Sequence, residues 1–412
     1  MRKEPTKMKI KIQKIPANEL IFFCAYFLYL MFALLSTSFY YRYFEGRMYT
    51  AVKMICIFIL LINEIVKSKM TLKSLNGLVI CGIIYIVIAY NTSLFSDVAL
   101  LLAFVYCGRN VSFEKIAKST IYISSVILAF VILSADVGII KNYVEIAGNR
   151  YREYLGFRYS LYPSAIIFNI TALVLYLKRG QIKALHMILL GLVNAFVFYK
   201  TNSRLSFYMA VLMILCMLLF QRFPKILERS RILHAGMSLS FLISAATSMI
   251  LTIKYNENVD WMRIVNRIFN NRLKLGNRSL TLYGASLLGK HNMEWVGNGL
   301  DSLGNKNTQT YLWVDNFYVS IMQRFGILVL VIIVLLLTFT LLKCLEKKNY
   351  YLMFMLTLMA VHCMIDDLFM YLNYNTFWFV IGTVLMAKRI LNSKQMAYRR
   401  SHTRRKKVKL RA

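Results

Sequence analysis

The sequence predicts an all-α fold, a polytopic bundle of about twelve transmembrane helices with both termini in the cytoplasm. Hydrophobic residues make up 58% of the 412 residues, and one span needs about 20 of them, so roughly a dozen spans are available. No Pro/Gly/Ser-rich linker divides the chain, and residues 1–412 are therefore expected to form one membrane domain.

The apolar runs give the expected spans in order. The first run follows the basic leader "MRKEPTKMKIKIQK", and because no small-x-small cleavage site comes after it, we interpret it as an uncleaved first helix. The fourth run is short for a span. The expected spans are 20–40, 51–66, 75–91, 94–108, 119–140, 160–177, 184–199, 205–221, 233–253, 313–342, 350–370 and 376–391.

Positive charge orients these spans. The chain has 51 Lys and Arg against 18 Asp and Glu, and most of the basic residues fall in the leader, the tail and the connections on their side of the bundle. The positive-inside rule places that side in the cytoplasm. We interpret the basic tail 392–412 as an anchor on the anionic inner leaflet, worth about 1 kcal/mol per basic residue, and expect no nucleic-acid partner.

Metal and cofactor chemistry is not expected. The seven cysteines form no CxxC pair and lie in or beside apolar runs, where cysteine acts as a small apolar residue. His291 and Glu294 are three residues apart but have no third ligand nearby. We interpret Asp366 and Asp367, near the end of the eleventh span, as a solvated helix end and not as an ion relay.

The external connection 141–158 breaks the charge rule. It contains Arg150, Arg152 and Arg158 among aromatic residues, in "NRYREYLGFRYS". Guanidinium groups suit bidentate contact with phosphate oxygens, so this stretch is predicted to bind a pyrophosphate at the outer face. An aromatic and basic belt that binds lipid phosphates without specificity is an equally good interpretation.

The long external loop 254–312 adds more positive charge. Apolar residues recur there at helical spacing, with basic residues on the opposite face, which predicts one amphipathic helix lying at the interface. A plain amphipathic connector is the competing interpretation. The apolar face is formed by Val259, Met262, Val265, Phe269 and Leu273. Arg272 and Arg278 lie in the same loop, and Arg204 stands in "TNSR" at the outer start of another span.

Asp315 and Asn316 enter the tenth span in "WVDNFYVSIMQRFG". Asp315 is predicted either to cap the helix that follows or to accept a proton from a hydroxyl beside an arginine-bound phosphate. The residues alone leave both roles open.

At these residues the chain resembles the Wzy-type polysaccharide polymerases of the O-antigen polymerase and ligase group. The resemblance rests on "GFRYSLYPS" after an arginine-bearing external connection, "TNSR" before a span, "NRL" followed by "LLG" and "GNG", and "VDNFYVSIMQRFG". It implies an enzyme of the bacterial cytoplasmic membrane that joins undecaprenyl-diphosphate-linked oligosaccharides on the outer face. Membrane lipids, a flippase and a chain-length regulator are the implied partners.

The resemblance also implies roles for individual residues. Asp315 would be the base or the residue that orients the acceptor, and Asn316 would contact a sugar. The arginines implied to hold the diphosphates are Arg152, Arg158, Arg204, Arg272 and Arg278. Related ligases have histidine before the asparagine, where this chain has Asp315, which disfavours a ligase. Two different functions stay open at this point, a flippase of lipid-linked sugars and a non-enzymatic anchoring protein.

Overall fold

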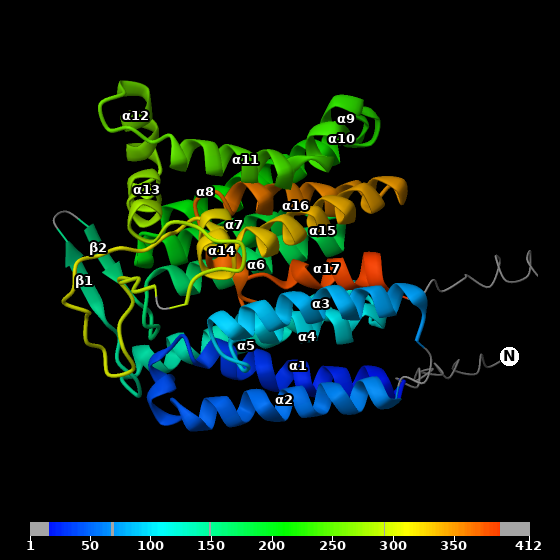
Figure 1. The fold of residues 1–412 in the computed structure, drawn as a ribbon, viewed down its shortest axis with the longest axis horizontal. Coiled ribbons are helices and arrows are strands. Elements are labelled where there is room, and N and C mark those ends of the chain that lie inside the picture. Colours follow the sequence, from blue (N-terminus) through cyan, green and yellow to red (C-terminus); the bar gives the residue numbers. More distant parts are fainter. Residues whose placement is uncertain (1–15, 67–69, 148–149, 292, 388–412) are drawn as a thin grey trace, which may run out of the picture.

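The computed structural model describes residues 16–66, 70–147, 150–291 and 293–387, which form a bundle of helices (Figure 1). The tail 392–412 and the whole leader lie outside these residues. The helices are α1 (Ala17–Leu35), α2 (Arg47–Val66), α3 (Leu72–Asn91), α4 (Asp97–Cys107), α5 (Phe113–Asp136), α6 (Leu161–Lys178), α7 (Ala184–Thr201), α8 (Arg204–Arg222), α9 (Pro224–Arg229), α10 (Arg231–Ser238), α11 (Ser240–Ile253), α12 (Asp260–Ile268), α13 (Arg272–Tyr283), α14 (Phe317–Phe325), α15 (Ile327–Glu346), α16 (Tyr350–His362) and α17 (Phe379–Ile381). Short 3₁₀ turns (Phe39–Tyr43, Gly108–Asn110, Leu368–Met370 and Thr376–Trp378) and a π-helical turn (Gly382–Met386) complete the helical elements of this part of the chain.

The structure is that of a helical membrane protein, as the sequence predicts. Among the described residues, eight helices are long and apolar enough to cross a bilayer: α1, α2, α3, α5, α6, α7, α8 and α15. The pair α10 and α11, bent by 58°, makes a ninth candidate. The other three expected spans, 94–108, 350–370 and 376–391, contain shorter apolar helices. α4 has 11 residues and is about 16 Å long, roughly half the thickness of the hydrocarbon core.

The expected span 313–342 is two helices. α14 ends at Phe325 and α15 begins at Ile327, on either side of Gly326 with a φ of +97°. A Cβ at Gly326 would lie 2.2 Å from the carbonyl oxygen of Leu287, so only glycine fits between the helices and the loop before them. The sequence shows one apolar run because both helices are apolar, and the break depends on that close approach.

The predicted amphipathic helix of the long loop is also two helices. α12 and α13 are separated by Asn270 and Asn271, whose φ values of +49° and +65° place both in the left-handed region. Asparagine tolerates this conformation better than most residues, so the two asparagines permit the turn. Leu273 is buried as expected, but the helical periodicity of residues 259–273 did not indicate the break.

The described part of the chain also contains a β-hairpin, which the all-α prediction missed. Strands β1 (Val144–Ala147) and β2 (Arg150–Glu153) pair antiparallel, with Glu145 opposite Arg152. Figure 1 shows the hairpin, α12 and the loop after α13 at one end of the bundle, which we call the hairpin end. α1 begins, and the Gly382–Met386 turn ends, at the opposite end.

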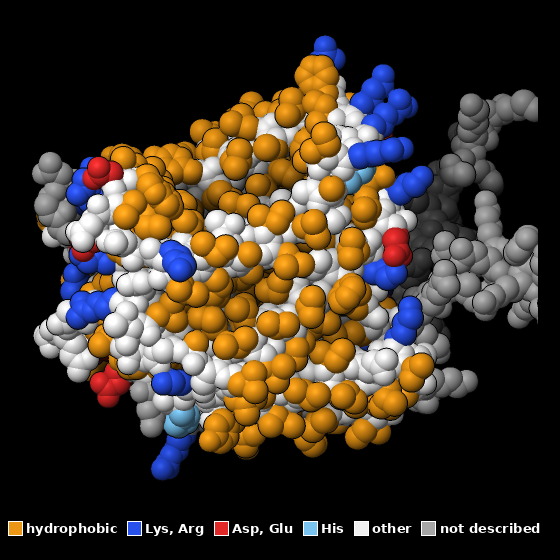
Figure 2. All heavy atoms as spheres, turned by 45° about the horizontal axis from the view of Figure 1, so that its top comes forward, with side chains coloured by type: hydrophobic (Ala, Val, Ile, Leu, Met, Phe, Trp, Pro, Cys, Tyr) orange, Lys and Arg blue, Asp and Glu red, His pale blue; other side chains and the backbone are white. Residues whose placement is uncertain are grey.

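The helices form two groups around a central one. Figure 1 shows α1 to α5 on one side and α7, α8, α11, α15 and α16 on the other. α6 lies between the groups, contacts α5, α7, α8 and α16, and is the most enclosed of the candidate spans. Figure 2 shows hydrophobic side chains over the middle of one face and most charged side chains towards its two ends, the pattern of a surface that contacts lipid.

Three segments that are distant in the sequence join at the hairpin end. The N–H of Phe39 donates to the carbonyl oxygen of Gly156 at 3.0 Å, and that of Arg158 donates to Thr37 at 2.9 Å. The N–H of Leu300 in turn donates to the carbonyl oxygen of Arg158 at 2.8 Å. These bonds tie the end of α1, the segment before α6 and the long loop into one wall.

Candidate functional site

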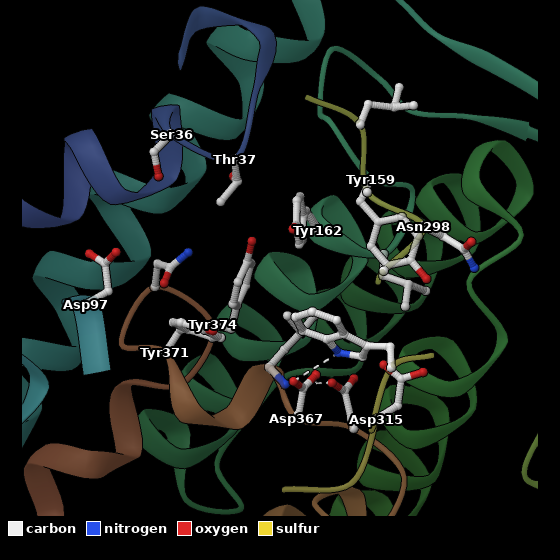
Figure 3. Close-up of a pocket in the computed structure, with 18 of the residues that line it drawn as sticks. Ser36, Thr37, Asp97, Tyr159, Tyr162, Asn298, Asp315, Asp367, Tyr371 and Tyr374 are labelled. Carbon is white, nitrogen blue, oxygen red and sulfur yellow. Dashed lines mark hydrogen bonds between the residues drawn. The ribbon is translucent and has the colours of Figure 1, made fainter. Parts of the chain in front are cut away.

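A cavity of about 430 Å³ lies behind this wall at the hairpin end. Helices α1, α2, α4 and α6 contribute their ends to it, and the loops before α14 and after α16 close it (Figure 3). The described side chains that give it chemical character are polar or aromatic: Ser36, Thr37, Tyr49, Asp97, Tyr159, Tyr162, Asn298, Tyr311, Trp313, Asp315, Asp366, Asp367, Tyr371, Asn373 and Tyr374.

Asp315 lines the cavity and is paired with Arg272. The Arg272 Nε atom lies 3.5 Å from the Asp315 Oδ2 atom, and both side chains are largely buried, 12% and 17% exposed. The hydroxyl of Tyr311 donates to the same carboxylate oxygen at 3.3 Å. Arg272 is the first residue of α13, so the break at Asn270 and Asn271 turns its side chain towards Asp315. Asp315 and Arg272, to which the resemblance gives the roles of base and diphosphate ligand, thus lie side by side.

Asp366 and Asp367 are buried, at 6% and 3% exposure, so their interpretation as a solvated helix end is wrong. α16 ends at His362, and the chain then turns inward along the cavity. An Asp366 Oδ2 atom lies 3.3 Å from the His362 Nε2 atom, and the Trp313 indole N–H donates to Asp367 at 3.2 Å. The polar sequence around the pair suggested water, although the same residues can line a cavity. We call Asp315, Asp366 and Asp367 the carboxylate cluster.

The three members of the cluster differ in pKa. Burial raises the pKa of Asp315, although the Arg272 charge opposes the shift. Burial and the charges of its two neighbours raise the pKa of Asp367 well above its usual range. Burial also disfavours the charged form of Asp366, but His362 and Arg272 outweigh it and lower that pKa. Carboxyl groups whose pKa values are separated in this way are suited to acid and base roles.

Asn316, not Asp315, caps the following helix. Its side-chain oxygen accepts the backbone N–H groups of Tyr318 and Val319, both at 3.1 Å, and its amide donates to the carbonyl oxygen of Met364 at 2.8 Å. Asp315 is therefore free of the capping role that the sequence left open. The side chain of Asn316 is engaged in these bonds and is not among the groups that line the cavity, so its predicted sugar contact gains no support.

Tyrosine rings cover much of the cavity wall (Figure 3). Tyr162 and Tyr374 stack with ring centroids 5.6 Å apart, and Tyr159 packs edge-on to Tyr162 at the same distance. Sugar rings bind well to such aromatic faces, with the phenol hydroxyl groups available for hydrogen bonds. The Tyr159 hydroxyl also interacts electrostatically with Asp315, Arg272 and Arg152, which places it between the cavity and the hairpin.

Arg152 lies on the hairpin next to two further arginines. Arg150 interacts electrostatically with Arg152 and Arg204, and its guanidinium donates to Asn202 at 3.4 Å. The Arg152 Nη1 atom lies 3.6 Å from a carboxylate oxygen of Glu145, which offsets part of the charge. The buried Nε atoms of Arg150 and Arg152 have no hydrogen-bond partner among the described residues. We call Arg150, Arg152 and Arg204, the first residue of α8, the hairpin arginines; guanidinium groups gathered in this way suit contact with an anion.

Arg158 and Arg278 are placed differently. The Arg158 guanidinium donates to the carbonyl oxygens of Ser36 at 2.7 Å and Leu300 at 3.4 Å, so it strengthens the wall between α1 and the long loop. Arg278 lies on the exposed face of α13, where it interacts with Lys274. Of the five arginines implied to hold diphosphates, the structure thus brings Arg152, Arg204 and Arg272 towards one region.

A separate carboxylate lies at the far side of the cavity (Figure 3). Asp97, the first residue of α4, accepts hydrogen bonds from the hydroxyl groups of Tyr49 at 2.9 Å and Tyr29 at 3.3 Å. The Lys53 ammonium lies 3.6 Å from its other oxygen. Ser96 caps α4 and fixes the start of the helix, so Asp97 is held against these partners. Sequence reasoning missed this group, because Asp97 and Lys53 lie in separate apolar runs.

Within the described residues, no group of three or more His, Cys, Asp and Glu side chains is arranged to hold a metal ion. The polar groups that remain can bind an anion, stack a sugar and move a proton. Searches of protein-family models, curated proteins and solved structures found nothing that matches this chain.

Proposed function

We propose that this protein polymerises lipid-linked oligosaccharide repeat units on the outer face of the bacterial cytoplasmic membrane. The growing glycan is transferred from undecaprenyl diphosphate to a sugar hydroxyl of the next lipid-linked unit. The observation that carries the proposal is the Asp315–Arg272 pair in a tyrosine-lined cavity beside the hairpin arginines.

The chemistry requires a base and stabilisation of a leaving anion. Asp315 takes the proton from the acceptor hydroxyl, whose oxygen attacks the anomeric carbon of the donor. The bond from that carbon to the diphosphate oxygen breaks, and the diphosphate leaves with the electron pair. Arg272 and the hairpin arginines stabilise the negative charge that grows on the diphosphate. A carboxyl group with a raised pKa is a stronger base than an ordinary aspartate, which suits this role.

The orientation is part of the proposal. The Lys and Arg bias of the connections assigns the hairpin end to the outside of the membrane and the opposite end to the cytoplasm. Lipid-linked oligosaccharides would then reach the cavity from the outer leaflet. The tyrosine faces are able to hold successive sugars, while the apolar exterior of the bundle accommodates the polyprenyl chains.

Reconstitution tests the proposed activity directly. Purified protein in proteoliposomes, supplied with a synthetic diphosphate-linked repeat, should yield a ladder of polymers that is visible by gel electrophoresis, and Asp315→Ala should yield only the starting repeat. Exposed Lys254→Ala is the matched control and should give the wild-type ladder. Transfer of the lipid-linked repeat between leaflets without any ladder would instead establish a flippase and refute the proposal.

A further inference from the structure

A second pocket of about 210 Å³ adjoins the cavity at the hairpin end. α3 and α14 form two of its sides, and the loop after α13 forms another. The side chains that line this pocket include two basic groups, two indole rings and an amide: Lys290, Arg324, Trp295, Trp313 and Asn91. Among the described residues, no carboxylate lines it.

Lys290 and Arg324 are the two cations of this pocket. In the part of the chain that the structure describes, neither Lys290 nor Arg324 is within salt-bridge distance of a carboxylate. Arg324 interacts electrostatically with Asp367 across the pocket wall, but among the described residues its guanidinium makes only weak contacts, with the Met370 sulfur at 3.9 Å and the Phe325 ring centroid at 5.1 Å. Two positive side chains in one cleft that no acidic group lines favour an anionic ligand.

The basic groups are held in position before any ligand arrives. The backbone N–H of Lys290 donates to the carbonyl oxygen of Gln323 at 3.0 Å, next to Arg324. A Cβ at Gly289 would lie 2.4 Å from the Arg324 carbonyl oxygen, so the loop packs directly on the helix backbone. The loop and the end of α14 therefore present both cations as one unit, and binding does not have to order them.

Trp313 connects this pocket with the reaction cavity. Its ring lines both spaces, and its indole N–H donates to Asp367 in the carboxylate cluster. Trp295 packs edge-on against it with centroids 5.8 Å apart, and its own N–H donates to Ser279 at 3.0 Å. A group bound in the second pocket thus lies one indole ring away from the proposed base region.

The pocket also has an apolar side. The Asn91 amide donates to the carbonyl oxygen of Leu288 at 2.7 Å, which joins the end of α3 to the loop. Ile86 and Tyr90 on α3 and Leu287 on the loop are exposed, at 68%, 75% and 63%. Since α3 is a candidate span, this exposed apolar surface suits contact with hydrocarbon. The buried Oδ1 atom of Asn91 has no hydrogen-bond partner among the described residues and can accept one from a sugar hydroxyl.

We propose that this pocket binds the diphosphate of the second polyprenyl-diphosphate substrate, with its lipid tail along α3. The identity of the lipid rests on the proposed function, because polymerisation requires a donor and an acceptor that each carry a diphosphate. The hairpin arginines and Arg272 hold one diphosphate, and Arg324 and Lys290 hold the other. The carboxylate cluster lies between them.

Calorimetric titration with farnesyl diphosphate tests this inference in detergent-solubilised full-length protein. Wild-type protein should bind two molecules, and Arg324→Gln should weaken one of the two sites about tenfold or more while the other keeps its affinity. Lys290→Gln, which changes an exposed loop residue and leaves the fold intact, should weaken the same site. Lys254→Gln serves as the control and should retain both sites. Unchanged titrations in both pocket variants would refute the inference.

Three further ligands separate the possible anions. Farnesol lacks the charge and should not fill the pocket, whereas pyrophosphate lacks the tail and should bind more weakly than farnesyl diphosphate. A phosphatidylglycerol that binds as tightly as farnesyl diphosphate would show an ordinary lipid site and overturn the inference. Binding is independent of turnover: Asp315→Asn should keep both sites. If wild-type protein bound two molecules of farnesyl diphosphate but made no polymer, the proposed function would be refuted and the second binding site would stand.

Discussion

The two ends of the reaction cavity both present carboxylates, but in different surroundings. At one end Asp97 faces one ammonium and two phenol donors, so its oxygens are well supplied with partners. At the other end Asp315, Asp366 and Asp367 lie near one guanidinium, that of Arg272, and the His362 ring lies beside Asp366. Three acidic groups crowded in this way cannot all ionise at ordinary aspartate pKa values.

This difference distinguishes a carboxylate suited to binding substrate from carboxylates suited to proton transfer. A carboxylate with matched donors, such as Asp97, holds its neighbours in place and can accept hydrogen bonds from sugar hydroxyls. Burial and neighbouring carboxylates raise the pKa values of Asp315 and Asp367, which makes their carboxylates stronger bases. We therefore assign proton transfer to the Asp315 end and sugar positioning to the Asp97 end.

The largest expected effect comes from removing the base. Asp315→Asn keeps the shape of the side chain but cannot take a proton, so kcat for polymerisation should fall about 10²–10⁴-fold. Asp97→Asn is the matched substitution at the other end and should lower kcat less than about tenfold, with the main change in KM. Initial rates on a synthetic diphosphate-linked repeat measure both. Equal losses of kcat would show that the two ends do not differ in the proposed way.

Arg272→Gln should have the next largest effect. The change removes a charge beside both Asp315 and the leaving diphosphate, so kcat/KM should fall about 10–100-fold. Arg278→Gln, on the exposed face of the same helix, is the control and should stay close to wild type. The same rate assay distinguishes them. If Arg278→Gln lost as much activity as Arg272→Gln, charge near α13 would matter without any specific contact.

The pH dependence of activity should show the smallest effect of the three, and it tests the role of Asp315 most specifically. Because Asp315 must be ionised to act as a base and its pKa is raised, activity should be lost on the acid side, about tenfold per pH unit below that pKa. The midpoint should lie above about 3.9, the ordinary value for aspartate. Arg272→Gln removes an opposing charge and should move the midpoint further up. Asp97→Asn should leave it in place; a shift there would mean that Asp97 titrates with the reaction.

Much of the bundle could be predicted from the sequence because a bilayer imposes long apolar helices. Every expected span contains an apolar helix, and the aspartate-bearing entry to the tenth span does lie beside an arginine. The predictions that failed, such as one continuous helix over 313–342, depend on backbone geometry. The break at Gly326 follows from the approach of Leu287, a residue 39 positions earlier, and local periodicity contains no trace of such a contact.

The missed site residues share one cause. Asp97 lies near the start of one apolar run and the Asp366–Asp367 pair near the end of another, and the polar sequence around that pair suggested a helix end in water. Their burial depends on which loops fold over them, and that is a tertiary property. The arginines of the 141–158 connection were conspicuous because their charge broke a rule, yet the sequence could not separate Arg158, which supports the wall, from Arg152, which is one of the hairpin arginines.

The wall that joins Phe39, Arg158 and Leu300 has a consequence for biogenesis. Its hydrogen bonds link parts of the chain that are synthesised at different times. The cavity therefore cannot close while the N-terminal helices alone are in the membrane. The pocket completes only after the long loop has been synthesised and has joined them, and the segment after α16 has followed. In a chain truncated before Leu300, the first helices would therefore insert, but the cavity would stay open and the protein would be inactive.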